Sequence, residues 1–395
     1  MTRYLFVVPP LVGHVNPVVG VAAELRARGH ATAWAGLPEV VGPLTGPGGE
    51  IHPCAVTLDG TAPPRPPELR GPAALKFLWA DFLVPLAEAM APGVAAAVDR
   101  FAPDVLVVDQ QAVAGALVAE RLGLPWATTA TTSAELTGAL AGLPLVEAWI
   151  ADLLTTLRQR VGDPHGTADP RFSPHLTLAF TTPELTGPLA ELPGPVRFVG
   201  PSITARPTPG PFPWEWLDPL RATVLVTLGT ANADAGTHFL TICRKVVRAR
   251  SERLQAVIVD PGGLLGDPRP DADVLVVPSV PQLRLLARTD AVVCHAGHNT
   301  VCEALWHGVP LVVAPIRDDQ PAIAGQVAAA GAGVRVRFGR TGTEQLGRAL
   351  NAVLDDPAHR SAARRIGASF RSAGGAAAAA TRLERLAAAP DRRPR

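Results

Sequence analysis

Short apolar segments alternate along this chain with longer segments of amphipathic, Ala-, Leu- and Arg-rich sequence. The short segments are rich in β-branched residues and the longer ones have helical spacing, a pattern that predicts βα units and parallel sheets. Strands are predicted at residues 4–9, 31–35, 105–108 and 126–129, and again at 223–228, 256–259, 274–277, 291–294, 311–314 and 333–337.

Helices are predicted between these strands. In the first half they cover residues 17–28, 75–101, 112–122 and 145–160, and Pro85 and Pro92 are expected to break the second of them. In the second half helices are expected to begin near residues 237, 281, 299, 322 and 343. A final helical pattern over residues 358–389 contains Gly374 and Gly375 as a break, and the residues beyond Pro390 are expected to be disordered.

The two halves are separated by a proline-dense segment, residues 200–213, which predicts a semi-rigid linker and a domain boundary near residue 205. The expected fold class is therefore α/β, with two Rossmann-like, doubly wound parallel-sheet domains that face a central cleft. Ligands of such sheets bind at the carboxyl ends of the strands.

Composition narrows the classes of protein. A length of 395 residues suits two domains, and a net charge of +1 with 18% charged residues argues against a nucleic-acid or anionic-lipid surface. Cys54, Cys243, Cys294 and Cys302 form no CxxC pair and are expected to be reduced and buried. The apolar run at the N-terminus is too short for a membrane span and lacks a cleavage site, so a cytoplasmic protein without a membrane span is expected.

The run from His295 to Thr300 is the most informative segment, because it joins a predicted strand to a predicted helix. It places backbone N–H groups, two imidazoles and a hydroxyl at one helix N-terminus, which favours bound phosphate. Asp319 and Gln320 follow the next strand and offer carboxylate and amide groups for sugar hydroxyls. The two features together predict a nucleotide-sugar site.

A second candidate site involves His14, which follows the first strand, and Asp109, which ends another. An imidazole at a strand end can accept a proton, and a neighbouring carboxylate can orient the ring and stabilise the imidazolium. Two simpler interpretations remain open: His14 caps its helix or contacts backbone, and Asp109 caps the helix that begins near Ala112.

Metal and other cofactor motifs are weak or absent in the sequence. His295, His298, Cys302 and Glu303 could suggest zinc, but the two histidines are not expected to share a face and no His-Glu-x-x-His spacing occurs, so no metal is predicted. The acidic pair in residues 271–273 could hold a metal ion and is interpreted as a solvated loop. The sequence contains no Walker loop, no GxGxxG after the first strand and no Gly-x-Ser-x-Gly elbow.

This combination of motifs resembles the UDP-glycosyltransferase superfamily of two-domain (GT-B) inverting enzymes, in its bacterial natural-product branch. The similarity covers essentially the whole chain. The segments that carry it are residues 6–17, 107–126, 198–201 and 226–230, and, most specifically, Val280-Pro-Gln-Leu-Arg-Leu-Leu286, His295-Ala-Gly-His-Asn-Thr300 and Asp319-Gln-Pro321.

The resemblance implies a role for each matching residue. His14 would deprotonate an acceptor hydroxyl, with Asp109 as its partner. The residues implied in donor binding are Thr230, His295, Gly297, His298, Asn299 and Thr300 at the diphosphate, Glu303 at the ribose, Val280 and Gln282 beside the base, and Asp319 and Gln320 at the sugar. Residues 1–205 would form the acceptor-binding domain, residues 206–365 the nucleotide-sugar domain, and residues 366–395 a C-terminal helix that packs back toward the first domain and ends in a disordered tail.

The implied reaction moves a sugar, a deoxysugar or glucose, from a dTDP- or UDP-sugar with inversion and without a cofactor, because the helix N-terminus stabilises the leaving diphosphate. The implied acceptor is a hydrophobic aglycone, such as a polyketide, macrolide, carotenoid or enediyne core. The apolar residues expected to bind it are Phe77, Trp79, Phe82, Leu136 and Trp149, although the same spacing suits a core-facing helix. The sequence does not determine the oligomeric state, for which a homodimer is one option.

Three positions depart from the family pattern: Ser279 replaces an aromatic residue that stacks on the base, His298 replaces Trp or Met, and Ile323 replaces an Asn on the donor side. Two other functions remain as alternatives. One is a sugar-nucleotide epimerase of the same architecture, and the other is a non-catalytic partner of another transferase.

Overall fold

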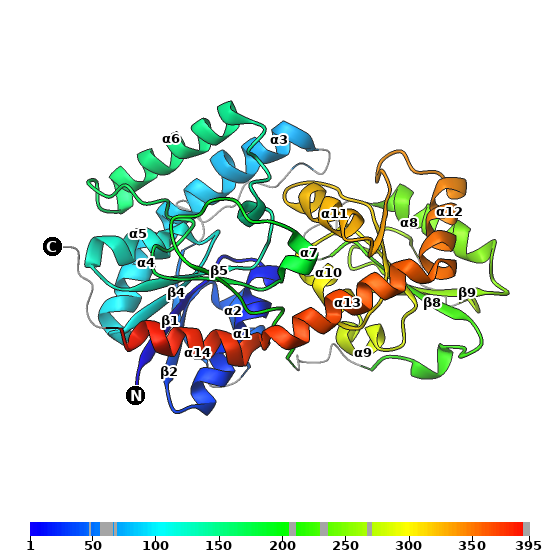
Figure 1. Cartoon of the computed structure of the whole chain (residues 1–395), viewed down its shortest axis with the longest axis horizontal. Coiled ribbons are helices and arrows are strands. Elements are labelled where there is room, and N and C mark those ends of the chain that lie inside the picture. The colour runs from blue at the N-terminus through cyan, green and yellow to red at the C-terminus, as the bar shows by residue number, and fades with distance from the viewer. Residues whose placement is uncertain are drawn as a thin grey trace.

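Two parallel sheets organise the molecule, seen here in a computed structural model that describes residues 1–46, 49–55, 66, 69–204, 211–229, 236–266 and 271–389. Within these residues one sheet has seven strands in the order β3-β2-β1-β4-β5-β6-β7, and the other has six in the order β10-β9-β8-β11-β12-β13. The sheets form two lobes that lie side by side, with helices on both faces of each (Figure 1). The prediction of two doubly wound α/β domains is confirmed.

The first lobe contains every strand predicted for the first half and three shorter strands, β3, β6 and β7, that were not predicted. Its strands are β1 (Arg3–Val7), β2 (Ala31–Gly36), β3 (Glu50–Pro53), β4 (Val105–Asp109), β5 (Trp126–Ala130), β6 (Thr177–Ala179) and β7 (Val196–Phe198). Its helices are α1 (Val12–Ala27), α2 (Pro38–Thr45), α3 (Gly71–Lys76), α4 (Val84–Phe101), α5 (Val113–Leu122), α6 (Pro144–Val161) and α7 (Pro183–Thr186), with a π-helical stretch at Phe77–Leu83 and a 3₁₀ turn at Glu135–Thr137.

The second lobe contains six strands within the described residues, all at or within two residues of their predicted positions. They are β8 (Ala222–Thr227), β9 (Leu254–Val259), β10 (Val274–Val277), β11 (Ala291–Cys294), β12 (Leu311–Val313) and β13 (Gly333–Arg335). The helices of this half of the chain are α8 (Thr237–Arg248), α9 (Gln282–Leu286), α10 (His298–Trp306), α11 (Gln320–Ala329), α12 (Thr343–Asp355), α13 (Pro357–Ala373) and α14 (Gly375–Ala387), the last of which packs on the first lobe, with a 3₁₀ turn at Trp214–Trp216.

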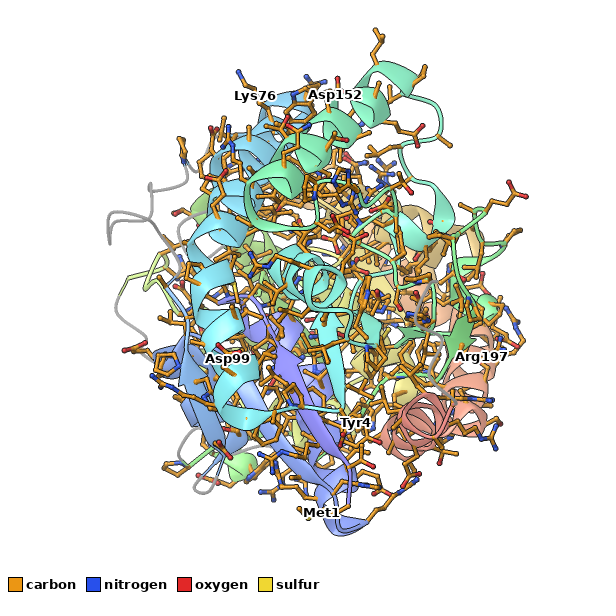
Figure 2. The ribbon with its side chains drawn as sticks, turned by 90° about the vertical axis from the view of Figure 1, so that its left-hand side faces the viewer. Met1, Tyr4, Lys76, Asp99, Asp152 and Arg197 are labelled. Carbon is orange, nitrogen blue, oxygen red and sulfur yellow. The ribbon has the colours of Figure 1, made fainter. Side chains whose placement is uncertain are left out.

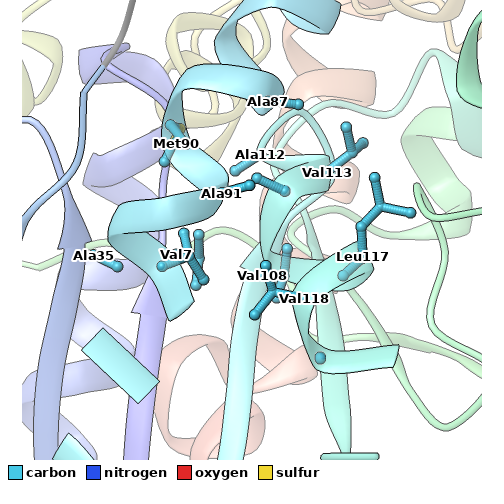
Figure 3. Packing of buried hydrophobic residues seen from close by; sticks show 14 of the residues in the cluster. Val7, Ala35, Ala87, Met90, Ala91, Val108, Ala112, Val113, Leu117 and Val118 are labelled. Atoms are coloured by element: carbon cyan, nitrogen blue, oxygen red, sulfur yellow. The ribbon is translucent and has the colours of Figure 1, made fainter. Parts of the chain in front are cut away.

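Helices cover both faces of each sheet. Successive strand residues point to opposite faces, so both sets of side chains are buried. In β1, Leu5 and Val7 pack with α4 and α5, whereas Tyr4 and Phe6 pack on the opposite face with α1 and α14. Figure 3 shows the first of these layers, in which Met90 of α4 lies above the ends of the strands. This double burial accounts for the continuous apolar runs from which the strands were predicted.

The helical segment from Gly71 to Phe101 is continuous, so the predicted breaks at Pro85 and Pro92 are wrong. A π-helical stretch directly precedes Pro85, and such stretches alter the hydrogen-bond pattern that a proline would otherwise interrupt. Pro92 lies inside α4, whose buried face against the sheet outweighs one lost backbone bond. By length and composition the segment is apolar enough to span a membrane, as core helices also are, and half of its most apolar window is buried in the structure.

Helix α6 lies beside this long helix at one end of the first lobe. Figure 2 shows Lys76 at the end of α3 and Asp152 of α6 at the same end of the molecule, far from Met1. Trp149 and Leu153 of α6 pack against the same apolar cluster as Phe82. The two helices therefore share one apolar layer of the first lobe.

The C-terminal helical segment crosses from one lobe to the other (Figure 1). Helix α13 packs on the second lobe, where Ile366 and Phe370 join its core, and α14 packs on the first, where Leu383 joins the core beneath α1. The segment divides at Gly374, whose φ of 90° is left-handed and favours glycine. Glu384 then accepts hydrogen bonds from Arg28 and His30, which ties α14 to the first lobe.

Candidate active site

His14 and Asp109 meet at the carboxyl edge of the first sheet. His14 lies in the first turn of α1, and Asp109 is the last residue of β4, which pairs directly with β1. The His14 Nδ1 atom is 2.9 Å from Asp109 Oδ1, with the imidazole 16% exposed and the carboxylate fully buried. Asp109 also accepts the Gln111 backbone N–H, so it holds the start of α5 as well as the ring.

Thr131, in the loop after β5, completes this arrangement. Its hydroxyl donates to Asp109 Oδ2 at 2.7 Å and lies 2.8 Å from His14 Nδ1. A carboxylate beside Nδ1 fixes the proton on that nitrogen and leaves Nε2 able to accept another. Burial lowers the pKa of His14, but the charge and hydrogen bond of Asp109, with Asp319 and Glu135 nearby, raise it overall above the ordinary 6.5.

The second half of the site is the N-terminus of α10. The turn from β11 passes through Ala296, whose φ of 66° is left-handed, and Gly297 caps the helix. The first bond within the helix runs from the Val301 N–H to the Gly297 carbonyl. The N–H groups of residues 298–300 consequently have no partner inside the helix, which is the arrangement that binds anions.

His295 stands immediately before this turn, between two glycines. A Cβ atom added at Gly229 would lie 2.7 Å from the His295 ring, and one added at Gly297 would lie 2.3 Å from it. Glycine is therefore required on both sides of the imidazole. Burial lowers the pKa of His295 to about 4, so the ring is neutral near pH 7 and can contribute a hydrogen bond but no charge.

His298 is oriented differently from the sequence interpretation, which assigned it to the diphosphate. Its Nε2 lies 3.3 Å from the Phe180 carbonyl and 3.4 Å from Cys302 Sγ, and its Nδ1 lies 3.4 Å from Ser133 Oγ. The ring is therefore buried against the first lobe. The backbone N–H of His298 lies at the helix N-terminus, where a phosphate would bind, but its side chain does not.

The residues assigned to the nucleoside lie together. Gln282, the first residue of α9, donates from Nε2 to Glu303 Oε2 at 2.7 Å. Val280 is half-buried against the core of the second lobe, close to the start of α9. Glu303 and Asn299 also line a small pocket with Pro17 and residues 201–203 of the first lobe. The pocket therefore lies where the two lobes meet.

The residues assigned to the sugar lie at the start of α11. Thr132 of the first lobe donates a hydrogen bond to Asp319, and burial raises the pKa of the Asp319 carboxyl. The Gln320 side-chain oxygen accepts the backbone N–H groups of Ile316 and Arg317, so this oxygen supports the loop after β12 instead of facing a sugar. Asp319 contacts the opposite lobe through its hydrogen bond with Thr132.

A direct contact joins the two halves of the site. The Asn299 side-chain amide, in the first turn of α10, donates to the Gly13 carbonyl at 2.6 Å. Gly13 immediately precedes His14. The N-terminus of α10 and the His14 imidazole thus belong to one site, although they are separated by almost 300 residues of sequence.

The predicted acceptor residues divide into two groups. Trp79 is 2% exposed and Leu136 is fully buried, so both belong to the core, and their assignment to an acceptor wall is corrected. Phe77, Phe82 and Trp149 are half-buried. Thr230, assigned to the diphosphate, lies outside the described residues.

The side chains that could have suggested a metal site are engaged with other protein groups. His298 and Cys302 contact each other, but no group of three His, Cys, Asp or Glu side chains that could hold a metal lies in the part of the chain that the structure describes. Asp271 forms an ion pair with Arg248, and Asp273 forms one with Arg221 at 2.8 Å. The acidic pair therefore joins surface segments of the second lobe.

Several site residues were missed in the sequence. Thr131, Thr132 and Ser133 are consecutive after β5, and each contacts a different part of the site: Ser133 donates to the Gln326 side chain of α11 at 2.7 Å. Glu135 follows them in the same loop. A run of polar residues directly after a buried strand was the available signal, and it is the same signal that identified Asp109.

Together the fold and this site define a class: a two-lobed, nucleotide-sugar-dependent glycosyltransferase of the GT-B architecture. Comparison with known proteins agrees. Residues 266–370 match the family model described as "UDP-glucoronosyl and UDP-glucosyl transferase". A solved glycosyltransferase of kitacinnamycin superposes with a TM-score of 0.78 at 25% identity and covers 98% of both chains.

Two relatives define the family more closely. The chain is 31% identical to 4'-demethylrebeccamycin synthase of Lentzea aerocolonigenes, over 92% of this chain and 94% of that protein. It is 30% identical to demethyllactenocin mycarosyltransferase of Streptomyces fradiae, over 98% of this chain and 87% of that protein. The chain belongs to the UDP-glycosyltransferase family, it is a glycosyltransferase, and its relatives are bacterial natural-product glycosyltransferases.

Proposed function

We propose that the protein transfers a sugar from a dTDP- or UDP-sugar to a hydroxyl of a hydrophobic natural product, with inversion and without a metal. The observation that carries this proposal is the His14–Asp109 contact of 2.9 Å in a site that also contains the α10 N-terminus. The Asn299–Gly13 hydrogen bond links the α10 N-terminus to the segment that carries His14.

In the proposed reaction, the acceptor O–H gives its proton to His14 Nε2 while its oxygen attacks the anomeric carbon. The bond from that carbon to the diphosphate oxygen breaks on the opposite face, so the configuration inverts. Asp109 stabilises the resulting imidazolium. The N–H groups at the start of α10 and the neutral His295 ring stabilise the charge that develops on the leaving diphosphate, which is the work that a metal ion does elsewhere.

The donor is assigned to the second lobe. In this proposal Gln282 and Glu303 contact the nucleoside, and Asp319 receives a sugar hydroxyl. Residues 206–365 form the donor domain and residues 1–205 the acceptor domain. The relatives named 4'-demethylrebeccamycin synthase and demethyllactenocin mycarosyltransferase support a natural-product acceptor. Four unpaired, buried thiols support a reducing compartment, the cytoplasm.

The experiment begins with thermal unfolding in a panel of UDP- and dTDP-sugars, because a bound donor raises the apparent stability. Transfer is then measured with the best donor. His14→Ala is expected to reduce turnover by about 10²- to 10⁴-fold and to leave UDP or dTDP affinity unchanged. His165→Ala, at an exposed histidine of the same lobe, is the matched control.

Full turnover in the His14→Ala variant would remove that residue from its role. Conversion of a sugar nucleotide without any acceptor would instead identify the protein as an epimerase.

A further inference from the structure

Glu135 lies close enough to the proposed reaction centre to help raise the pKa of His14, and the proposed reaction gives it no other role. It begins the 3₁₀ turn that follows β5, two residues after the run Thr131, Thr132 and Ser133. That run contacts the His14–Asp109 pair, Asp319 and Gln326 in turn. Glu135 is therefore attached to the loop that joins the proton acceptor to the donor side.

One oxygen of the half-buried Glu135 side chain has no hydrogen-bond partner among the described residues. Its Oε2 atom is inaccessible to solvent and forms no hydrogen bond with the described residues. A polar atom in such a position normally has a partner, because burial without one is costly. An acceptor molecule bound next to His14 is a candidate for the missing donor.

Ionisable groups face Glu135 from several elements. His14 on α1, Asp109 on β4 and Asp319 at the start of α11 interact with it electrostatically, as do Asp169 and Arg171 in the segment before β6. Burial raises the pKa of Glu135 to about 7, which Arg171 partly opposes. The carboxyl can therefore accept a hydrogen bond at neutral pH and becomes a stronger acceptor as the pH rises.

Within the protein, Arg171 is the cation that interacts electrostatically with Glu135, but it is hydrogen-bonded to another carboxylate. Its Nε and Nη2 atoms donate to Asp169 at 3.0 and 2.6 Å, which makes a bidentate ion pair. Its guanidinium group also lies over the rings of Trp79 and Phe172. No ion pair joins it to Glu135 among the described residues, so Arg171 does not supply the missing hydrogen-bond donor.

We propose that Glu135 binds the acceptor by receiving a hydrogen bond from a second polar hydrogen, an O–H or N–H next to the hydroxyl that His14 deprotonates. This inference rests on the proposed function, in which His14 deprotonates the reacting hydroxyl of the acceptor. It narrows the acceptor class from any hydrophobic alcohol to apolar molecules with two neighbouring polar hydrogens. Buried groups that lose such a partner discriminate strongly between ligands.

The test compares two probes, 2,3-dihydroxynaphthalene and 2-naphthol, which differ by one neighbouring hydroxyl. Binding of each probe to the UDP- or dTDP-loaded protein is measured by calorimetry, and transfer is measured separately. We expect Glu135→Met to reduce the preference for the diol by about 10-fold or more, and Glu135→Gln to restore part of it. The two probes differ in acidity, but this difference is the same for every variant. It therefore cancels when the ratio of the two probe affinities is compared between variants.

Glu147→Met, the same change at an exposed glutamate of α6, is the matched control and should keep the wild-type preference. Equal losses for both probes in Glu135→Met would overturn the proposal, because Glu135 would then act on His14 and not on the acceptor. Failure of the wild-type protein to bind either probe would overturn it too. Diol binding that depends on Glu135 without any transfer would support this inference and contradict the proposed function instead.

Discussion

Thr132 donates a hydrogen bond to Asp319 across the boundary between the lobes, joining the loop after β5 to the start of α11. The Asp319 carboxyl is in an environment that raises its pKa, and Thr132 opposes that rise. The residue assigned to the donor sugar is therefore held, before any sugar binds, by a hydroxyl of the opposite lobe.

Removing this hydroxyl should destabilise the protein in a ligand-dependent way. Thr132→Val is expected to lower the free energy of unfolding by about 1–3 kcal/mol, because a half-buried carboxyl loses its donor. A donor-sugar hydroxyl would replace that donor, so the loss should be smaller with UDP-sugar than with UDP alone. Urea unfolding measures the loss of stability with UDP-sugar and with UDP alone. Thr155→Val, at an exposed threonine, is the control. An equal loss under both conditions would argue against Asp319 as a sugar ligand.

The pH dependence of transfer should report His14. The ring must be neutral to accept a proton, and its pKa lies above 6.5 because Asp109 and the other carboxyls outweigh the effect of burial. Activity should therefore fall as the pH decreases through this raised pKa. Asp109→Asn should move the fall in kcat/KM to lower pH and should also reduce kcat. Both parameters are measured from about pH 5 to pH 9. An unmoved profile would mean that Asp109 does not control the titration.

The glycine before α10 should be essential for nucleotide binding. In Gly297→Ala the new Cβ would lie 2.3 Å from His295 Nε2, so the ring or the turn must move. We expect UDP or dTDP affinity to fall roughly 10-fold, or about 1.4 kcal/mol, in a calorimetric titration. Gly325→Ala in α11 is the control, because a Cβ there meets no atom within 4 Å. Unchanged affinity in the first variant would show that the turn tolerates the displacement.

Two tryptophans near the proposed acceptor region should behave differently. Trp79 is 2% exposed in the core, so Trp79→Ala should lower the free energy of unfolding by about 3–5 kcal/mol. Trp149 is half-buried on α6, so Trp149→Ala should cost less stability and instead raise the KM for 2-naphthol. Urea unfolding and steady-state kinetics separate the two effects. A large stability loss and an unchanged KM for Trp149→Ala would place this residue in the core as well.

Much of the fold was predictable because it depends on local sequence. Strands buried on both faces leave continuous apolar runs, and helices leave a repeat of 3.6 residues. The turns that carry His14, Asp109 and His295 were also predictable, since each directly follows a strand and parallel strands place their carboxyl ends at one edge. The prolines of the long helix misled the prediction, because a π-helical stretch and burial against the sheet cannot be read from a proline alone.

The amino-acid sequence by itself determined two parallel sheets, their approximate strands, the family, and the residue types at the strand ends. Only the tertiary structure decided where the side chains point: that His298 turns into the first lobe, that Trp79 and Leu136 lie in the core, and that the buried Glu135 oxygen has no hydrogen-bond partner among the described residues. The physical reason is that strand and helix periods are local. The neighbours of a side chain come instead from segments often more than 100 residues away, and packing alone brings them together.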